Sequence, residues 1–162
     1  MTETLIEGRA WRFGSDVDTD VIFPWQYANL EQSEYANHVM EPANPDFADA
    51  VEPGDCIVAE TNFGIGSSRE HAPIAIKAAG VGTVIAASFG RIFYRNAVNQ
   101  GLPPIECEID DITRIEEDDT LTVDLSAGTV ENVDAGETYD FEPFQEPVRS
   151  ILVAGGAAGY YG

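Results

Sequence analysis

The residues of this chain best suited to chemistry lie in one short stretch, in which Gly64 and Gly66 precede Ser67, Ser68 and Arg69. Glycines let a backbone bend sharply and pass close to a ligand. The stretch follows a strand-like run and opens a helix-like run, so unpaired N–H groups and the helix dipole favour an anion there. Two hydroxyls and a guanidinium suit a small molecule that carries carboxylates.

A purely structural interpretation of the same stretch is also open. Ser67 and Glu70 match the S-x-x-E capping box, which any helix start can use. The glycine spacing lacks the lysine of a P-loop and the third glycine of a dinucleotide-binding loop, so neither site is expected. A cap and an active site remain compatible, because one serine can cap the helix while its neighbour does chemistry.

The surrounding elements are predicted from hydrophobic pattern and from Gly/Pro punctuation. Strands are expected over 5–13, 56–60, 81–87, 102–109, 121–125, 129–133 and 138–144, and helices over 34–40, 46–51, 70–79, 91–100 and 147–154. The strand–helix–strand order over 56–87 predicts two parallel strands with a right-handed crossover. The glycine-rich stretch then lies at the carboxyl end of a parallel strand, where α/β sheets bind ligands. We expect an α/β fold with a parallel βαβ core and added β-hairpins, in a single domain over residues 1–162.

The charge of the chain is unevenly distributed. The net charge is −21, yet residues 61–105 carry Arg69, Lys77, Arg91 and Arg95 against Glu70 alone, a net of +3. The remaining 28 acidic residues face four arginines, a net of −24. An acidic coat disfavours nucleic acid and anionic membranes as partners, whereas a small anion drawn to the middle of the chain fits.

Composition also indicates the setting in which the protein works. Acid-rich, lysine-poor surfaces keep halophilic proteins soluble, so we predict a high-salt cytoplasm, with an acidic mesophilic protein as the alternative. No apolar run reaches membrane-span length and no secretory leader opens the chain, so a soluble cytoplasmic protein is expected. Cys56 and Cys107 lie in separate predicted strands without metal-ligand spacing, which favours two buried thiols over a disulfide.

Other residues that could do chemistry leave two interpretations open. The aspartates of Asp16-Val17-Asp18-Thr19-Asp20 lack the glycine and glutamate of an EF-hand, so they either bond their own backbone in a turn or face the site. The nearly uncharged segment 25–30 is either surface packing or a wall for an apolar substituent. His71 is expected to pack or cap, and Arg91 and Arg95 to balance the acidic coat.

Several spaced motifs, in order, resemble one known family. The segment 62–73, Asn-Phe-Gly-Ile-Gly-Ser-Ser-Arg-Glu-His-Ala-Pro, closely resembles the signature of the small subunits of 3-isopropylmalate dehydratase, in the aconitase superfamily. The segments 16–20, 88–96 and 99–103 resemble further family motifs, and the similarity covers roughly residues 5 to 155. The resemblance implies a swivelling β/β/α-type domain that covers a separate large subunit, as a heterodimer or heterotetramer.

The resemblance also implies cofactor and residue roles. The [4Fe–4S] cluster belongs to the large subunit, and this chain binds no metal. By position in the motifs, Ser67 is the catalytic base, Arg69 and Ser68 bind a substrate carboxylate, and Thr19 and Asp20 line the site. The family reaction dehydrates 2-isopropylmalate and rehydrates the alkene to 3-isopropylmalate, a step of leucine biosynthesis.

The resemblance places substrate selection in Tyr27, Ala28, Asn29 and Leu30. Relatives that accept a tricarboxylate tend to place an arginine there, and this chain has none, which favours a dicarboxylate with an alkyl branch. The alternatives are the small subunit of homoaconitase, of a citramalate isomerase or of another aconitase-like hydro-lyase. A stand-alone module that binds organic anions is the alternative outside the enzymes.

Overall fold

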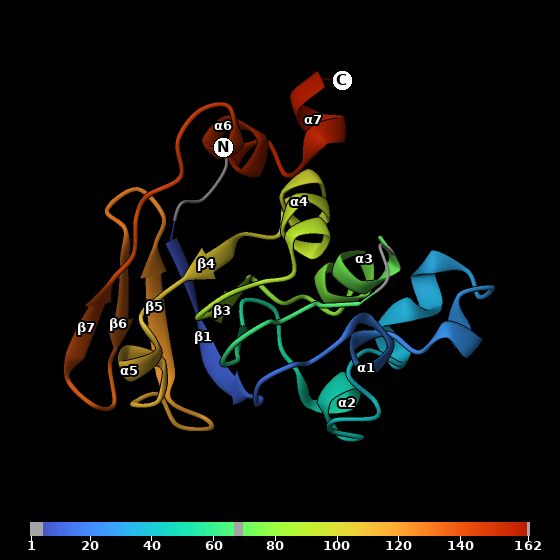
Figure 1. Ribbon diagram of the computed structural model, residues 1–162, viewed down its shortest axis with the longest axis horizontal. Helices are drawn as coiled ribbons and strands as arrows, with labels where there is room; N and C mark the ends of the chain where they lie inside the picture. Colours follow the sequence, from blue (N-terminus) through green and yellow to red (C-terminus); the bar gives the residue numbers. More distant parts are fainter. Residues whose placement is uncertain (1–4, 67–69, 162) are drawn as a thin grey trace.

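One mixed sheet runs through the computed structural model, which describes residues 5–66 and 70–161 (Figure 1). The sheet is seven-stranded, in the order β4-β3-β2-β1-β5-β6-β7. Its members are β1 (Leu5–Arg12), β2 (Cys56–Val58), β3 (Thr83–Ala86), β4 (Pro104–Glu106), β5 (Thr120–Asp124), β6 (Thr129–Asn132) and β7 (Glu137–Asp140). The neighbouring strands β4, β3, β2 and β1 are parallel to one another. From β1 onward, through β5 and β6 to β7, each strand is antiparallel to the one before it.

The parallel half is built as the sequence predicts. α3 (His71–Ala78) connects β2 to β3, and α4 (Arg91–Asn99) connects β3 to β4. β2 is apolar and buried throughout, and β3 is buried throughout with Thr83 as its polar residue, as is typical of parallel strands covered on each side. In Figure 1, α3 and α4 lie next to each other on one side of the sheet. The expected α/β fold with a parallel βαβ core and added hairpins is therefore confirmed.

Two hydrophobic cores lie on opposite faces of the parallel strands. The first core packs the helices against the sheet through Trp11, Phe23, Phe63, Ile76 and Phe93. It also holds the short helices α1 (Thr19–Ile22) and α2 (Phe47–Ala50) and the 3-10 helices η1 (Trp25–Tyr27) and η2 (Gln32–Asn37). The second core joins parallel strands to antiparallel ones, with Val58, Ile85 and Ile105 packed among Leu121, Val123, Val130 and Tyr139. The sheet therefore curls, and its antiparallel half covers one face of its parallel half.

Four element predictions need correction. The strand expected over 138–144 ends at Asp140, and residues 141–145 after it have no regular secondary structure. The helix expected over 34–40 is a 3-10 helix that stops before Met40, which has a φ of 60° and whose N–H bonds Ile22 O instead. The strand expected over 102–109 is shorter, because α5 (Ile109–Ile112) begins where its last residue was placed. The helix expected over 147–154 is α6 (Val148–Val153), and a further helix that was not expected, α7 (Ala157–Tyr161), follows it beyond Gly155-Gly156.

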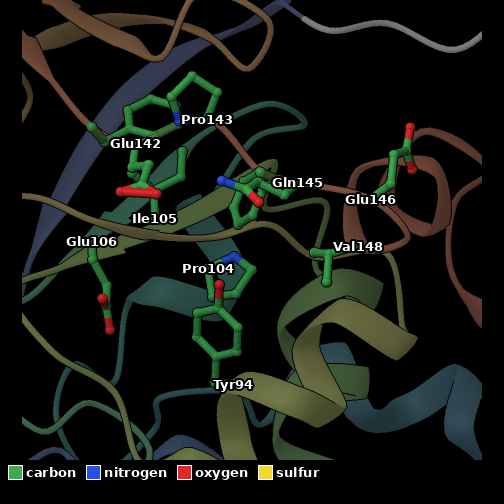
Figure 2. A pocket seen from close by; sticks show the side chains of 11 residues that line it. Tyr94, Pro104, Ile105, Glu106, Glu142, Pro143, Gln145, Glu146 and Val148 are labelled. Atoms are coloured by element: carbon green, nitrogen blue, oxygen red, sulfur yellow. The ribbon is translucent and has the colours of Figure 1, made fainter.

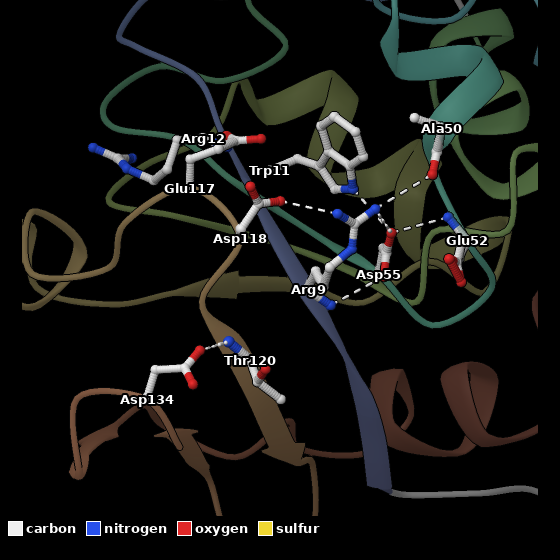
Figure 3. A network of polar contacts seen from close by, with 10 residues as sticks. All are labelled: Arg9, Trp11, Arg12, Ala50, Glu52, Asp55, Glu117, Asp118, Thr120 and Asp134. Atoms are coloured by element: carbon white, nitrogen blue, oxygen red, sulfur yellow. Dashed lines mark hydrogen bonds and ion pairs between the residues drawn. The ribbon is translucent and has the colours of Figure 1, made fainter.

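Asp55 is a buried carboxylate that joins the first strand to the segment before β2 (Figure 3). It accepts hydrogen bonds from Arg9 N at 3.0 Å, Trp11 Nε1 at 2.9 Å and Glu52 N at 2.9 Å. The Arg9 guanidinium lies 3.8 Å away and also pairs with Asp118 at 3.0 Å. A buried charge with this many donors is satisfied, and it fixes the register of β1 beside β2.

Lys77, the single lysine of the chain, has a structural position. Its ammonium donates to Gln100 O at 2.5 Å and to Gly155 O at 2.9 Å, which ties α3 to the ends of α4 and α6. Cations favour such carbonyl-rich helix ends. Burial lowers the pKa of Lys77. No helix among the described residues combines the length and the apolarity that crossing a bilayer requires.

Candidate functional site

The segment 16–20 and the loop 61–66 lie side by side, although some 46 residues separate them in sequence. Asp16 N donates to Thr61 O at 2.8 Å, Gly64 N to Val17 O at 2.7 Å and Thr19 N to Ile65 O at 3.0 Å. These backbone bonds place the start of α1 against the end of the glycine-rich loop. Two segments that the sequence singled out separately therefore form one site.

Both glycines of the loop are required by its geometry. Gly64 has a φ of +83°, and a Cβ there would lie 2.3 Å from Cγ of the buried Phe93. Gly66 has a φ of +107°, and a Cβ there would lie 3.4 Å from Thr19 Oγ1. Positive φ values are readily adopted by glycine alone. The loop consequently reaches close to Thr19 at its carboxyl end.

The three aspartates of segment 16–20 have different positions. Asp18 caps α1, since its Oδ1 accepts from Val21 N at 2.9 Å. Asp16 Oδ1 accepts from Asn62 Nδ2 at 3.0 Å. Asp18 therefore bonds its own backbone, as one of the two interpretations held, whereas Asp16 bonds a side chain of the 61–66 loop. Thr19 is buried and Asp20 is exposed, both in the first turn of α1 beside the loop.

Ser67, Ser68 and Arg69 lie outside the described residues, and their assigned roles stay predictions. The described residues on either side of them are Gly66, which adjoins Thr19, and Glu70, from which α3 begins. α3 has no side-chain cap hydrogen bond from Glu70.

The segment 27–30 is anchored more firmly than its sequence suggests. Tyr27 stacks on His38 with ring centroids 3.7 Å apart, and its hydroxyl donates to Glu41 Oε1 at 2.6 Å. His38 Nδ1 lies 3.1 Å from Glu41 Oε2. The hydrogen bond to Glu41 raises the pKa of Tyr27, and the bonds from Tyr27 and His38 lower the pKa of Glu41. His38 and Glu41 are not among the residues that the sequence motifs indicated, and their i, i+3 spacing is the signal that the sequence offers for them.

The remaining residues of this segment divide between packing and exposure. Tyr35 Oη donates to Ala28 O at 3.0 Å. Leu30 is partly buried against the first core, whereas Asn29 is exposed. Asn29 is therefore the position in 27–30 whose side chain is most open to solvent and to a partner.

An aromatic group connects this segment to the start of α3. The His71 ring stacks near Phe23 at 6.3 Å, tilts against Tyr35 at 5.8 Å and meets Trp25 edge-on at 6.4 Å. His71 is thus packed, as expected, and its Nδ1 is buried without a hydrogen bond to any described residue. Trp25 is 62% exposed. The interpretation of segment 25–30 as packing therefore holds for Tyr27 and Leu30, whereas a role for Trp25 as an apolar wall stays a prediction.

Three larger cavities have linings that do not suit a dicarboxylate. The first, of about 410 Å³, lies between α4, β4 and the segment before α6, and Glu106, Glu142 and Glu146 line it (Figure 2). A second, of about 680 Å³, is lined by four acidic residues: Glu106, Glu108, Asp140 and Glu142. A third, of about 490 Å³, contains Lys77, whose ammonium is already bonded to carbonyls. Carboxylates repel an anion, so the acidic cavities do not suit a dicarboxylate, although the second one borders the 61–66 loop at Thr61.

The cysteines do not fit a [4Fe–4S] cluster, which cysteine thiolates hold. Cys56 and Cys107 are free and buried in the second core, as predicted. Burial raises the pKa of each thiol to about 12. No group of three or more His, Cys, Asp or Glu side chains in 5–66 and 70–161 is placed to hold a metal ion.

Comparisons with known proteins show what the chain as a whole is similar to. A family model described as the aconitase C-terminal domain matches residues 23–110. The 3-isopropylmalate dehydratase small subunit of Nautilia profundicola is 52% identical over 157 residues, which cover 96% of this chain and 93% of that protein. The methanogen homoaconitase small subunit of Methanothermobacter thermautotrophicus is 49% identical over 160 residues, covering 98% and 92%.

A solved structure extends the similarity to the fold. The crystal structure of 3-isopropylmalate dehydratase from Methanocaldococcus jannaschii matches with a TM-score of 0.91 at 44% identity, over 97% of this chain and 93% of that one. Relatives named for two different substrates thus have nearly equal identity to this chain.

Proposed function

This chain belongs to the aconitase C-terminal domain family, among the small subunits of its dehydratases, and on that premise we propose that it is the small subunit of a 3-isopropylmalate dehydratase. Its relatives are named as subunits of hydro-lyases, and a small subunit implies a large one. The reaction proposed here removes water from 2-isopropylmalate and adds it back one carbon over. The product, 3-isopropylmalate, serves leucine biosynthesis in the cytoplasm.

One observation supports a catalytic role for this chain above the others. Segment 16–20 and the glycine-rich loop, each of which matches a family motif, are bonded to each other through Thr19 N and Ile65 O. Thr19 and Asp20, in the first turn of α1, therefore lie next to Ile65 and Gly66, the two residues that precede Ser67 in the sequence. We propose that the site is composed of both segments and includes the Thr19 hydroxyl and the Asp20 carboxylate together with the base.

We assign the base to Ser67. Dehydration requires a proton to be taken from the carbon next to a substrate carboxylate, and the same proton site must return it during rehydration. A serine hydroxyl is a weak base, so its alkoxide needs backbone N–H donors, a positive helix start and a nearby guanidinium. Arg69 supplies that guanidinium and binds a carboxylate, to which Ser68 donates a hydrogen bond.

The cofactor and the partner follow from the same premise. We assign the [4Fe–4S] cluster to the large subunit, since Cys56 and Cys107 are buried and their thiols have a raised pKa. A cluster held there would supply a Lewis acid for the substrate hydroxyl. The chain then works as a heterodimer or heterotetramer with that subunit.

We favour an alkyl-branched dicarboxylate as substrate. Segment 27–30 has no cation, and the exposed Trp25 next to it offers apolar surface. A third carboxylate would remain poorly compensated against such a wall. Homoaconitase is the second candidate, because a homoaconitase small subunit is 49% identical to this chain. Citramalate remains a smaller alternative of the favoured class.

Reconstitution tests the proposal directly. The chain and its large subunit are purified, combined anaerobically with the cluster reconstituted, and assayed on 2-isopropylmalate, citramalate and homocitrate. We expect turnover by the mixture alone, with the highest kcat/KM for 2-isopropylmalate. A preference for homocitrate supports the second candidate. Binding of an organic anion by this chain alone, with an inactive mixture, identifies a binding module instead.

A further inference from the structure

Arg91 and Arg95 are two exposed arginines of one helix that have no acidic partner within the described residues, a property that they share with Arg149 on α6. Arg9, Arg12 and Arg114 each form an ion pair with a carboxylate, at 3.0, 3.0 and 3.9 Å. Within 5–66 and 70–161, neither Arg91 nor Arg95 has a carboxylate at ion-pair distance, although the chain holds 29 acidic residues. Both side chains are exposed. They therefore do not balance the acidic coat through contacts of their own.

The position of these arginines is electrostatically unfavourable for the helix. Arg91 is the first residue of α4, and the first turn contains no acidic residue. A helix N-terminus carries partial positive charge, so cations there lower helix stability. Arg95 follows Arg91 at i+4, where two like charges repel. Two unfavourable charge placements on one helix, with no carboxylate near them among the described residues, are typical of a functional surface.

The arginines adjoin the proposed active site. Gly90 N, just before α4, donates to Phe63 O at 2.9 Å, and the Phe93 ring packs edge-on against Phe63 at 5.3 Å. Phe93 faces the core, which leaves Arg91, Ile92 and Arg95 on the outer face, where Ile92 is 46% exposed. The outer face of α4 thus continues the surface that begins at the 61–66 loop.

We propose that Arg91, Ile92 and Arg95 form a docking surface for the large subunit and meet a face of that partner rich in Asp and Glu carboxylates. The inference rests on the proposed function, which requires the partner to approach the 61–66 loop. An exposed apolar residue flanked by two guanidiniums resembles a protein interface, in which arginine is enriched. The three residues line none of the cavities described above, so a flat protein surface fits them better than a small ligand.

The positive charge of this surface determines where on the chain an acidic partner is attracted. Outside residues 61–105 the chain has a net charge of −24, which repels an acidic partner. Two unpaired guanidiniums beside the active site attract carboxylates at that one place. They would orient the partner so that its cluster and this chain's 61–66 loop face each other.

The test compares assembly of the purified large subunit with wild-type chain and with the double variant Arg91→Glu/Arg95→Glu. We expect the dissociation constant to rise at least about tenfold, which corresponds to about 1.4 kcal/mol. Wild-type affinity should weaken as KCl rises over the range in which both subunits stay folded, and the variant should lose that dependence. The melting temperature of the variant alone should be equal or higher, because the new carboxylates suit the helix N-terminus.

The matched control is Arg149→Glu, which reverses an exposed arginine on α6 that forms no ion pair within the described residues. We expect it to assemble like wild type. At saturating large subunit, the double variant should retain the wild-type KM for substrate. An unchanged dissociation constant overturns the inference, as does a raised KM with normal assembly, which would assign the arginines to the substrate. If the wild-type pair assembles but is inactive, the proposed function fails and the docking surface stands.

Discussion

The backbone N–H of Thr19 donates to the carbonyl of Ile65 at 3.0 Å, and this bond joins the two motifs on which the site depends. The next residue, Gly66, lies close to Thr19, since a Cβ on Gly66 would lie 3.4 Å from Thr19 Oγ1. The proposed base therefore continues from a backbone that is already fixed against α1. Gly66, which precedes the proposed base in the sequence, therefore lies against a segment some 46 places earlier in the chain.

Removing the proposed base should abolish turnover and leave folding intact. We expect Ser67→Ala to lower kcat by about 10²–10⁴-fold, the range that general-base catalysis supplies. The melting temperature and the affinity for the large subunit should match wild type. Ser33→Ala, which alters an exposed serine of η2, is the control. Near-normal turnover by Ser67→Ala would falsify the assignment of the base.

A cation placed in the selection segment should move substrate preference toward tricarboxylates. Asn29→Arg is the sharper test, because Asn29 is exposed, whereas Leu30→Arg also disturbs packing against the first core. We expect the ratio of kcat/KM for homocitrate over 2-isopropylmalate to rise roughly tenfold, about 1.4 kcal/mol of discrimination. Gln32→Arg adds the same charge outside the segment and should leave the ratio unchanged. An unaltered ratio in Asn29→Arg removes segment 27–30 from substrate selection.

Asp55→Asn should destabilise the fold without acting on the chemistry. The amide nitrogen of asparagine would face N–H donors from Trp11 and Glu52 at one of the two oxygen positions, leaving buried donors unpaired. We expect a loss of about 1–3 kcal/mol in the free energy of unfolding, measured by denaturant titration. Asp49→Asn, at an exposed position, is the matched control. Equal stability of the two variants contradicts the structural role of Asp55.

Both thiols should be unreactive in the native protein at neutral pH. Burial raises the pKa of Cys56 and of Cys107 to about 12, so almost no thiolate is present there. We expect an alkylating reagent to label neither cysteine until denaturant is added, as read by intact mass. Rapid labelling of the native chain, or iron bound by this chain purified alone, would reopen the question of which subunit holds the cluster.

Salt should stabilise the protein. With 29 acidic residues and one lysine, the chain repels itself, and this repulsion is screened as ionic strength rises. We expect the melting temperature to increase from low to multimolar KCl. Equal melting temperatures across that range would indicate an acidic mesophilic protein rather than a halophilic one.

The amino-acid sequence by itself determined the local structure and the chemistry available. The alternation of strand, helix and glycine over 56–87 predicted β2, α3 and β3, since parallel strands buried on both faces must be apolar throughout. Motif positions likewise indicated Ser67, Arg69 and Thr19. These features depend on neighbouring residues, whose types decide turns, caps and periodicity.

Only the tertiary structure determined which residues distant in sequence contact each other. It placed Thr19 against Ile65 and anchored Tyr27 on His38 and Glu41, and in the part of the chain that the structure describes it left Arg91 and Arg95 without acidic partners. It also curled the antiparallel half of the sheet over the second core. Such contacts depend on how the chain returns over long sequence separations, and no local pattern of charge or hydrophobicity determines which distant groups will meet.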